Sequence, residues 1–253
     1  MSPAQMRLEW PSSRGLKAIV ACWPLPSDTP AALPFAVQST GRSDYENGDI
    51  MTDARLYAPA ALRNRDLILD VLQTHLPERG LILEIASGSG QHCIRFGEGL
   101  PNHIIQPSDP KPDARASINA WIADSGLANI RPALTLDAAA AVWPIEAADA
   151  ILCINMIHIA PWHAAQGLFA GGAQLLPANG PLYLYGPFKQ DGHHTAPSNA
   201  AFDAALRQEN PDWGVRDLET VSALATSCGF GAPTIIAMPA NNLSLIFRRE
   251  AAS

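Results

Sequence analysis

A chain of 253 residues with an apolar fraction of 47% is long enough to bury the core of one large domain. Its formal net charge of −7 argues against broad binding to nucleic acid or anionic membranes, because both need basic surfaces. The cysteines show no C-x-x-C spacing, which favours free thiols in a reducing, cytoplasmic location over disulfides or zinc; they are Cys22, Cys93, Cys153 and Cys228.

Residues 1–50 differ from the rest, because their apolar residues show no sustained period of 2 or 3.6. Two interpretations stay open: an irregular N-terminal arm, or an extension from a misassigned start codon upstream of Met51. The run Leu16–Leu25 resembles the apolar core of a signal peptide, but it is short and is broken by Pro24, so we expect no secretion. No apolar run approaches the roughly 20 residues of a membrane helix. We therefore predict one domain over residues 51–253.

From Pro59 onward the apolar pattern is regular, and strands alternate with helices. Continuous apolar strands in this alternation predict a parallel sheet covered on both faces. The predicted helices are Pro59–Leu76, Gln91–Leu100, Asp113–Asp124 and His163–Leu176, and the predicted strands are Leu81–Ala86, His103–Gln106, Ile130–Leu136, Asp149–Ile154 and Pro181–Tyr185.

The C-terminal segment changes this rhythm. After a predicted helix over Asp217–Cys228, the strands Thr234–Met238 and Leu243–Arg248 are joined by a short Pro/Asn turn, which predicts an antiparallel hairpin. The whole pattern predicts an α/β fold with a doubly wound, mostly parallel, seven-stranded Rossmann-like sheet that ends in this hairpin. Such an arrangement is typical of class I methyltransferases, whereas nucleotide-binding Rossmann domains lack the hairpin.

The stretch Leu81–Phe96, LILEIASGSGQHCIRF, holds a glycine turn between a strand and a helix. Gly88 and Gly90 let a ligand approach the backbone amides, but a dinucleotide fingerprint would need glycine or alanine where Cys93 stands. Glu84 would repel a pyrophosphate and would suit the ammonium group of S-adenosylmethionine (SAM). We therefore predict SAM as cofactor, with Glu84, Ala86, Ser87, Gly88 and Gly90 in its site.

Two further carboxylates follow the next predicted strands. Asp109 comes 19 residues after Gly90, where an acid can accept both ribose hydroxyls of an adenosine. Asp137 ends the third predicted strand, where the adenine amino group would lie. Each also has a simpler interpretation as a helix cap or turn residue. Three acids at consecutive strand ends favour SAM over the simpler interpretation.

Eight runs carry a resemblance to a known family: RNRDLILDVL, LEIASGSGQH, PSDP, CINMIHIAPW, YGPFKQDG, SNAAFDAALR, WGVRDLE and MPANNLSLIFRR. They resemble the domain-of-unknown-function family 938, which includes methyltransferase-like protein 26. The resemblance covers about residues 54–249 and implies a class I methyltransferase fold and SAM, but no substrate. Ala86 stands where the common methyltransferase loop has its first glycine, in agreement with this family's own pattern.

The predicted strand Asp149–Ile154 delivers Asn155 and His158 to the sheet edge where ligands of open α/β sheets bind. This N-x-x-H pattern resembles that of many small-molecule methyltransferases, so we expect both residues to act in catalysis and Asn155 also to contact the cofactor. His158 is the candidate general base, because an imidazole titrates near neutral pH. The alternative is a histidine that only packs beside the cofactor.

Other side chains near this edge are candidates for contacts with a small-molecule substrate. Neighbouring histidines on a loop are usually solvated, so we expect no metal at Asp191, His193 and His194. The substrate candidates are Arg63, Trp162, Tyr185, Phe188 and His193.

The leading functional prediction is a SAM-dependent methyltransferase that acts on a small molecule by in-line displacement, in which alignment of the reactants supplies most of the acceleration. One alternative is a SAM-binding protein without transferase activity that acts through a partner. The other is an NAD-dependent oxidoreductase, which Glu84 and Cys93 disfavour. No nucleic-acid or membrane partner is expected.

Overall fold

The computed structural model describes residues 38–39, 43–44 and 51–251, all within one compact unit, Leu33–Ser253. Most of the predicted N-terminal arm, with Cys22 and the run Leu16–Leu25, lies outside the described residues. The boundary at residue 50 therefore stays a prediction. In the part of the chain that is described, no helix combines the length and the apolar character that crossing a membrane requires.

Four short strands precede the first helix. β1 (Gln38–Ser39) pairs antiparallel with β4 (Leu56–Tyr57), and β2 (Ser43–Asp44) pairs antiparallel with β3 (Met51–Thr52). The backbone N–H of Leu56 donates to Ser117 Oγ at 2.8 Å, so β4 is attached to the folded domain.

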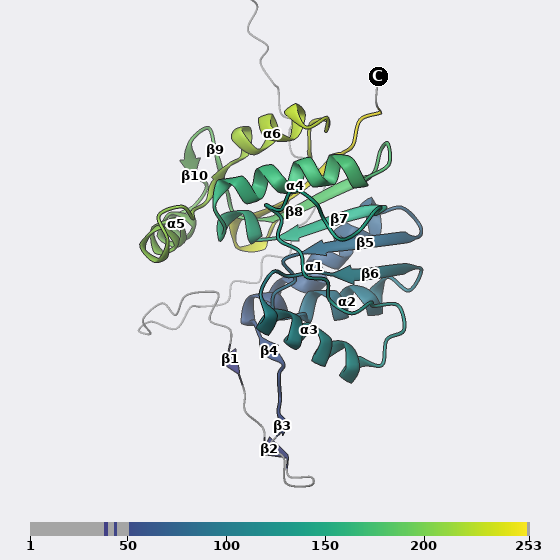
Figure 1. The fold of residues 1–253 in the computed structure, drawn as a ribbon. Coiled ribbons are helices and arrows are strands. Elements are labelled where there is room, and N and C mark those ends of the chain that lie inside the picture. The colour runs from purple at the N-terminus through teal and green to yellow at the C-terminus, as the bar shows by residue number, and fades with distance from the viewer. Residues whose placement is uncertain (1–37, 40–42, 45–50, 252–253) are drawn as a thin grey trace, which may run out of the picture. The chain divides into compact units, whose positions relative to one another are not determined.

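A six-stranded sheet forms the centre of the domain (Figure 1). Four neighbouring parallel strands present their carboxyl ends at one edge, and the C-terminal strand runs antiparallel to both of its neighbours. This arrangement confirms the predicted α/β class and the terminal hairpin. In spatial order the strands are β12 (Thr234–Met238), β13 (Asn242–Arg248), β8 (Pro181–Gly186), β7 (Ala150–Ile154), β5 (Gly80–Ile85) and β6 (His103–Pro107).

The predicted count of seven strands is wrong, because the segment Ile130–Leu136 does not form a continuous strand. It runs parallel to β6 but contributes only isolated bridges, at Ile130 and Leu134. Pro132 lies between these two bridges, and proline has no N–H to donate to a ladder. The segment therefore follows the sheet edge without extending it.

Helices cover both faces of the sheet (Figure 1). On one face lie α1 (Pro59–His75), α2 (Gln91–Gly99) and α3 (Pro112–Ser125), and on the other lie α4 (Trp162–Leu175) and α6 (Leu218–Ser227). Successive strand residues point to opposite faces, so the four central strands of the sheet contribute to both cores. The first core includes Ile68, Leu72, Ile82, Phe96 and Ile118, and the second includes Leu83, Leu168, Phe169, Val221 and Phe230.

A segment that the apolar periodicity does not predict lies beyond the carboxyl ends of the parallel strands (Figure 1). It contains β9 (Phe188–Gln190), β10 (His193–His194), α5 (Pro197–Glu209) and β11 (Arg216–Asp217). β9 pairs antiparallel with β10 and parallel with β11. We call residues 187–217 the cap segment.

Candidate functional site

The glycine turn between β5 and α2 has an unusual backbone. Ala86, Gly88 and Gly90 have φ values of 55°, 59° and 92°, all in the left-handed region. Glycine adopts this region freely, whereas alanine there costs about 1 kcal/mol. Ala86 accepts this strain at the position where the common methyltransferase loop has glycine.

The two glycines of the turn have different roles. A Cβ on Gly90 would lie 2.9 Å from the Cα of Ile118, so Gly90 lets α3 pack against the turn. A Cβ on Gly88 would find its nearest atom among the described residues at 3.9 Å, the carbonyl oxygen of Ala86. The backbone at Gly88 is therefore open to a ligand, whereas the backbone at Gly90 is covered by protein.

Glu84 is a buried carboxylic acid beside this turn, with 1% of its surface exposed. Its Oε2 atom has no hydrogen-bond partner among the described residues. Burial raises the pKa of Glu84 to about 8, a hydrogen bond with Ser87 lowers it, and the nearby Asp109 raises it further. Glu84 thus offers an unsatisfied polar atom next to the open backbone.

Asp109 joins the end of β6 to the glycine turn. Its Oδ2 accepts a hydrogen bond from the Gly88 N–H at 3.1 Å, and its Oδ1 accepts one from the Lys111 N–H at 2.9 Å. Burial raises the pKa of Asp109, and these two N–H donors offset part of that rise. The fold therefore brings Glu84, Gly88 and Asp109 together at one edge of the sheet.

Asp137 is exposed and bonds within its own turn, where its Oδ1 accepts from the Ala139 N–H at 2.9 Å. This contact matches the simpler interpretation of Asp137 as a turn residue. Its predicted contact with adenine stays a prediction.

Asn155 begins the turn that follows β7. It has a left-handed φ of 61°, and its N–H donates to the carbonyl of Tyr185 at 2.8 Å. Asparagine tolerates this conformation better than most residues. The short helix η1 (Met156–His158) follows directly.

His158 is fully buried, and its two ring nitrogens have different surroundings. Nδ1 faces the backbone N–H of Arg216 at 3.3 Å, so Nδ1 is the acceptor and we assign the ring hydrogen to Nε2. Nε2 has no partner among the described residues and lies against Gly186, where an added Cβ would be 2.5 Å away. Burial lowers the pKa of His158 to about 3, and the charge of Arg216 lowers it further.

Arg216 is a site residue that the sequence patterns did not single out. Its Nε donates to the carbonyl of Ile157 at 2.8 Å, and its Nη2 donates to that of Ala160 at 2.6 Å. The guanidinium carbon lies 5.6 Å from the centre of the Trp162 ring. Arg216 thus holds η1 in place from the cap segment. Its position in the run WGVRDLE is the one signal the sequence offered.

The substrate candidates separate into two groups. Tyr185 is buried at the end of β8, and this burial raises its pKa. Three contacts lower the pKa again: hydrogen bonds with Asn64 and Asn242, and the charge of Arg63. Arg63 itself is exposed. Arg63 and Tyr185 therefore lie close together, near the carboxyl end of β8.

The other three candidates lie in or beside the cap segment. Phe188 is fully buried and packs edge-on against His158, with ring centres 5.0 Å apart. Trp162 packs under Arg216, and His193 is exposed in a turn where its Nδ1 bonds the carbonyl of Asp191. No cluster of three potential metal ligands occurs in the described part of the chain.

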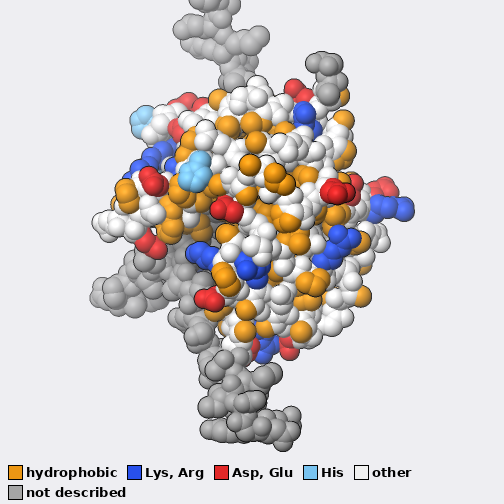
Figure 2. Space-filling view, in the orientation of Figure 1, with side chains coloured by type: hydrophobic (Ala, Val, Ile, Leu, Met, Phe, Trp, Pro, Cys, Tyr) orange, Lys and Arg blue, Asp and Glu red, His pale blue; other side chains and the backbone are white. Residues whose placement is uncertain are grey.

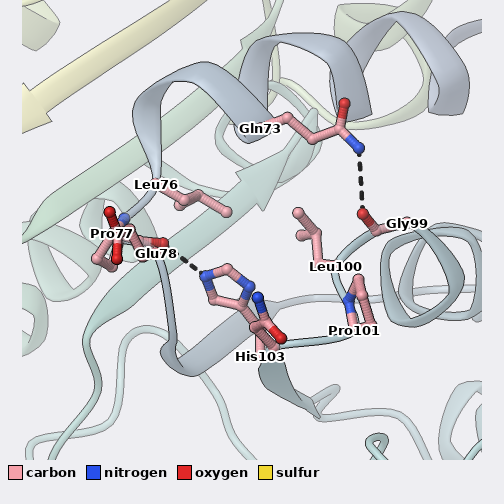
Figure 3. A pocket seen from close by; sticks show the side chains of 9 residues that line it. Gln73, Leu76, Pro77, Glu78, Gly99, Leu100, Pro101 and His103 are labelled. Carbon is pink, nitrogen blue, oxygen red and sulfur yellow. Dashed lines mark hydrogen bonds between the residues drawn. The ribbon is translucent and has the colours of Figure 1, made fainter.

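A small cavity of about 230 Å³ lies at the opposite edge of the sheet (Figure 3). Its walls come from the last turns of α1 and α2 and from the start of β6. His103 Nε2 bonds the carbonyl of Pro77 at 2.8 Å, and Gln73 Nε2 donates to the carbonyl of Gly99 at 3.1 Å. A larger cavity of about 530 Å³ lies between residues 139–146 and α4. Neither cavity contains a predicted cofactor residue.

Charged side chains of both signs are mixed with apolar ones on the face shown in Figure 2. They do not gather there into the continuous basic surface that is typical of nucleic-acid binding.

The fold resembles solved methyltransferase structures. An O-methyltransferase family protein from Burkholderia thailandensis is 18% identical, with a TM-score of 0.66 over 77% of this chain and 58% of that one. Human N-acetylserotonin methyltransferase in complex with SAM is 14% identical, with a TM-score of 0.61 over 74% and 52%. An O-methyltransferase family 2 protein from Planctomyces limnophilus in complex with apigenin is 17% identical, with a TM-score of 0.60 over 74% and 61%.

This chain thus spans between about half and three fifths of the length of those proteins. At these identities the likeness establishes the fold. A family model described as "Protein of unknown function (DUF938)" matches residues 55–249. That match covers the sheet, its helices and the whole carboxyl edge, and the chain therefore belongs to the DUF938 family and has the class I methyltransferase fold.

Proposed function

We propose that this protein is a SAM-dependent methyltransferase with a small-molecule acceptor. The observation that carries the proposal is the buried carboxyl of Glu84, whose Oε2 has no hydrogen-bond partner among the described residues. It lies beside the backbone of Gly88, whose N–H donates to Asp109. An unsatisfied buried polar atom is rare in a native protein and calls for a partner. The human neighbour solved with SAM and the neighbour solved with apigenin support a cofactor and an acceptor of these kinds.

Each part of the cofactor has a candidate contact. Glu84 would hold the ammonium group, Asp109 the ribose hydroxyls and Asp137 the adenine amino group. The loop residues Ala86, Ser87 and Gly88, together with Asn155, would line the methionine part, and Gly90, which α3 covers, would hold the turn in the conformation that presents them. SAM itself would supply a methyl group on a sulfonium, and the remaining work of the protein is to align the acceptor and exclude water.

His158 serves in this proposal as a positioning residue. Its basic nitrogen, Nδ1, already faces the Arg216 N–H, and its other nitrogen carries the hydrogen. A group with a pKa near 3 is also a weak base at neutral pH. The Nε2–H group and Asn155 Oδ1 both lie against Gly186. In this proposal the ring therefore fixes the position of Asn155 and Gly186 at the carboxyl ends of β7 and β8.

The role of His158 predicts a mild kinetic effect. We expect His158→Ala to lower kcat by less than about 100-fold, to leave the SAM affinity nearly unchanged and to keep the shape of the pH–rate profile. His158→Gln, which retains a side-chain acceptor, is the matched control for the loss of the Arg216 contact. A larger fall in kcat with loss of an ionisation near neutral pH would make His158 the general base after all.

The ribose assignment predicts a loss of affinity. We expect Asp109→Ala to weaken SAM binding by roughly 1.5–3 kcal/mol, the scale of a charged hydrogen-bond partner. Asp109→Asn, which keeps one oxygen to accept from Gly88, should lose less. Isothermal titration with SAM measures both variants. Parental affinity in Asp109→Ala would show that this carboxylate does not hold the ribose.

Turnover decides between an enzyme and a SAM-binding protein that acts through a partner. We expect labelled SAM and a screen of small-molecule acceptors to yield S-adenosylhomocysteine. SAM binding without turnover in any acceptor pool would favour the binding protein, and tight binding of NAD in place of SAM would favour the oxidoreductase. We also propose a reducing, cytoplasmic location, in line with the free thiols of the described cysteines.

A further inference from the structure

This inference rests on the proposed function and concerns what happens at Glu84 when the site fills. We propose that Glu84 is protonated in the empty protein and gives up its proton when an ammonium-bearing cofactor binds, so that SAM binding releases one proton to solvent.

The surroundings of Glu84 favour the neutral acid. With 1% exposure it has almost no contact with water, and no described basic side chain forms an ion pair with it. Its polar neighbours are the hydroxyl of Ser87, the carboxyl of Asp109 and the buried thiols of Cys93 and Cys153. None of these carries a positive charge. A bare carboxylate in such a place costs several kcal/mol, so the group keeps its proton.

An ammonium group reverses this preference. A positive charge in contact with the carboxyl favours the ionised form, and the free Oε2 gives it a hydrogen-bond acceptor. When the ligand binds, the O–H bond of the neutral Glu84 acid breaks, the carboxylate pairs with the ammonium, and the proton goes to the buffer. No other bond changes.

Asp109 does not supply this proton. Burial raises the pKa of Asp109, but both of its oxygens accept backbone N–H groups and the charges of Lys111 and Arg115 favour its ionised form. Its proposed ligand, a pair of ribose hydroxyls, is neutral. A charged Asp109 close to Glu84 also helps Glu84 to retain its proton until a cation arrives.

Isothermal titration at pH 6.5 tests the proposal. Heats are measured in phosphate and in imidazole buffer, whose ionisation enthalpies differ, and the difference yields the number of protons exchanged. We expect release of close to one proton for SAM and for S-adenosylhomocysteine, both of which carry the ammonium. Methylthioadenosine, which lacks the amino acid part, should release close to none. By linkage, SAM should bind about tenfold more tightly at pH 7.0 than at pH 6.0.

Glu84→Gln is the matched variant, because an amide has the shape of the neutral acid and cannot ionise. We expect it to bind SAM more weakly, with no proton released and no dependence on pH between 6.0 and 7.0. Undiminished release in Glu84→Gln, or equal release with methylthioadenosine, would place the proton elsewhere and overturn the proposal. SAM binding with no release overturns this inference alone, whereas failure to bind SAM overturns the proposed function with it. The comparison of ligands on the parent protein needs no variant to fold.

A measurement on the empty protein gives an independent readout. The pKa of Glu84 is raised in the folded state, so its contribution to stability is fully present below the unfolded value of about 4.3 and is lost as pH rises through about 8. The free energy of unfolding should therefore fall between pH 5 and pH 8 more steeply in the parent than in Glu84→Gln. Parallel curves for the two proteins would show that Glu84 is already ionised.

Discussion

Gly88→Ala is expected to weaken SAM binding by at least about 100-fold, or about 2.7 kcal/mol, while the protein stays folded. Among the described residues, the added methyl group would meet no atom closer than 3.9 Å. The proposed cofactor approaches the backbone at this position. The cost to stability is the left-handed φ of 59°, about 1 kcal/mol for alanine.

Gly90→Ala is the matched control, two residues away in the same turn. Its Cβ would lie 2.9 Å from Ile118 Cα, a backbone atom of α3 that cannot rotate away. We expect this variant to lose about 3 kcal/mol of unfolding free energy. Thermal melting and isothermal titration on both variants separate the two effects. If Gly88→Ala bound SAM like the parent, the cofactor would not lie against this turn.

Asp203→Ala is expected to lower the free energy of unfolding by about 3 kcal/mol, because it removes the central anion of the cap segment. Asp203 is buried, with 6% of its surface exposed. Its Oδ2 lies 3.2 Å from Lys189 Nζ and 3.2 Å from His194 Nε2. Its Oδ1 accepts from Arg207 Nε at 3.1 Å and from the Val215 N–H at 2.8 Å. Arg207 is half exposed, so its share is small.

The loss of these contacts of Asp203 should also disturb the candidate site, because the cap segment holds η1 in place. The Gly214 N–H donates to the His158 carbonyl at 2.9 Å, and Arg216 follows two residues later. We therefore expect kcat to fall together with stability in Asp203→Ala. Asp212→Ala, an exposed acid in the same segment, should change stability by no more than about 0.5 kcal/mol.

The effect of Asp203 should depend on pH. Burial raises the pKa of Asp203, but the Val215 N–H, the Lys189 ammonium and the charge of Arg207 together lower it by more, so the net pKa lies below its ordinary value. A depressed folded pKa contributes stability above the unfolded value of about 3.9 and loses it as pH falls through the folded value. The difference between parent and Asp203→Ala should thus persist at neutral pH and shrink as the pH falls below about 4. A constant difference down to pH 2 would assign it to packing instead of charge.

The sequence by itself determined the layered α/β fold, the terminal hairpin and the glycine turn. These follow from local properties: apolar runs of strand or helix period, bounded by proline, glycine and asparagine. Once the strands are parallel, their carboxyl ends share one edge, so the proximity of Glu84, Gly88 and Asp109 was predictable as well. Pro132 is also a local signal in the sequence, and it argues against a continuous strand between the bridges at Ile130 and Leu134.

Only the tertiary structure decided the conformation of the cap segment and the burial and hydrogen bonding of the His158 ring. The cap segment is held by contacts of Asp203 with Lys189, His194 and Val215, which come from other parts of the segment and follow no apolar period. A histidine in an N-x-x-H pattern can be a base or a packed ring, and the burial and hydrogen bonds that bear on this choice come from its neighbours in space. Here the Arg216 N–H, 58 residues away, occupies Nδ1, and Gly186 closes over Nε2. Burial and tautomer depend on such long-range contacts, because the protonation of a side chain follows its surroundings in space and not its neighbours in the chain.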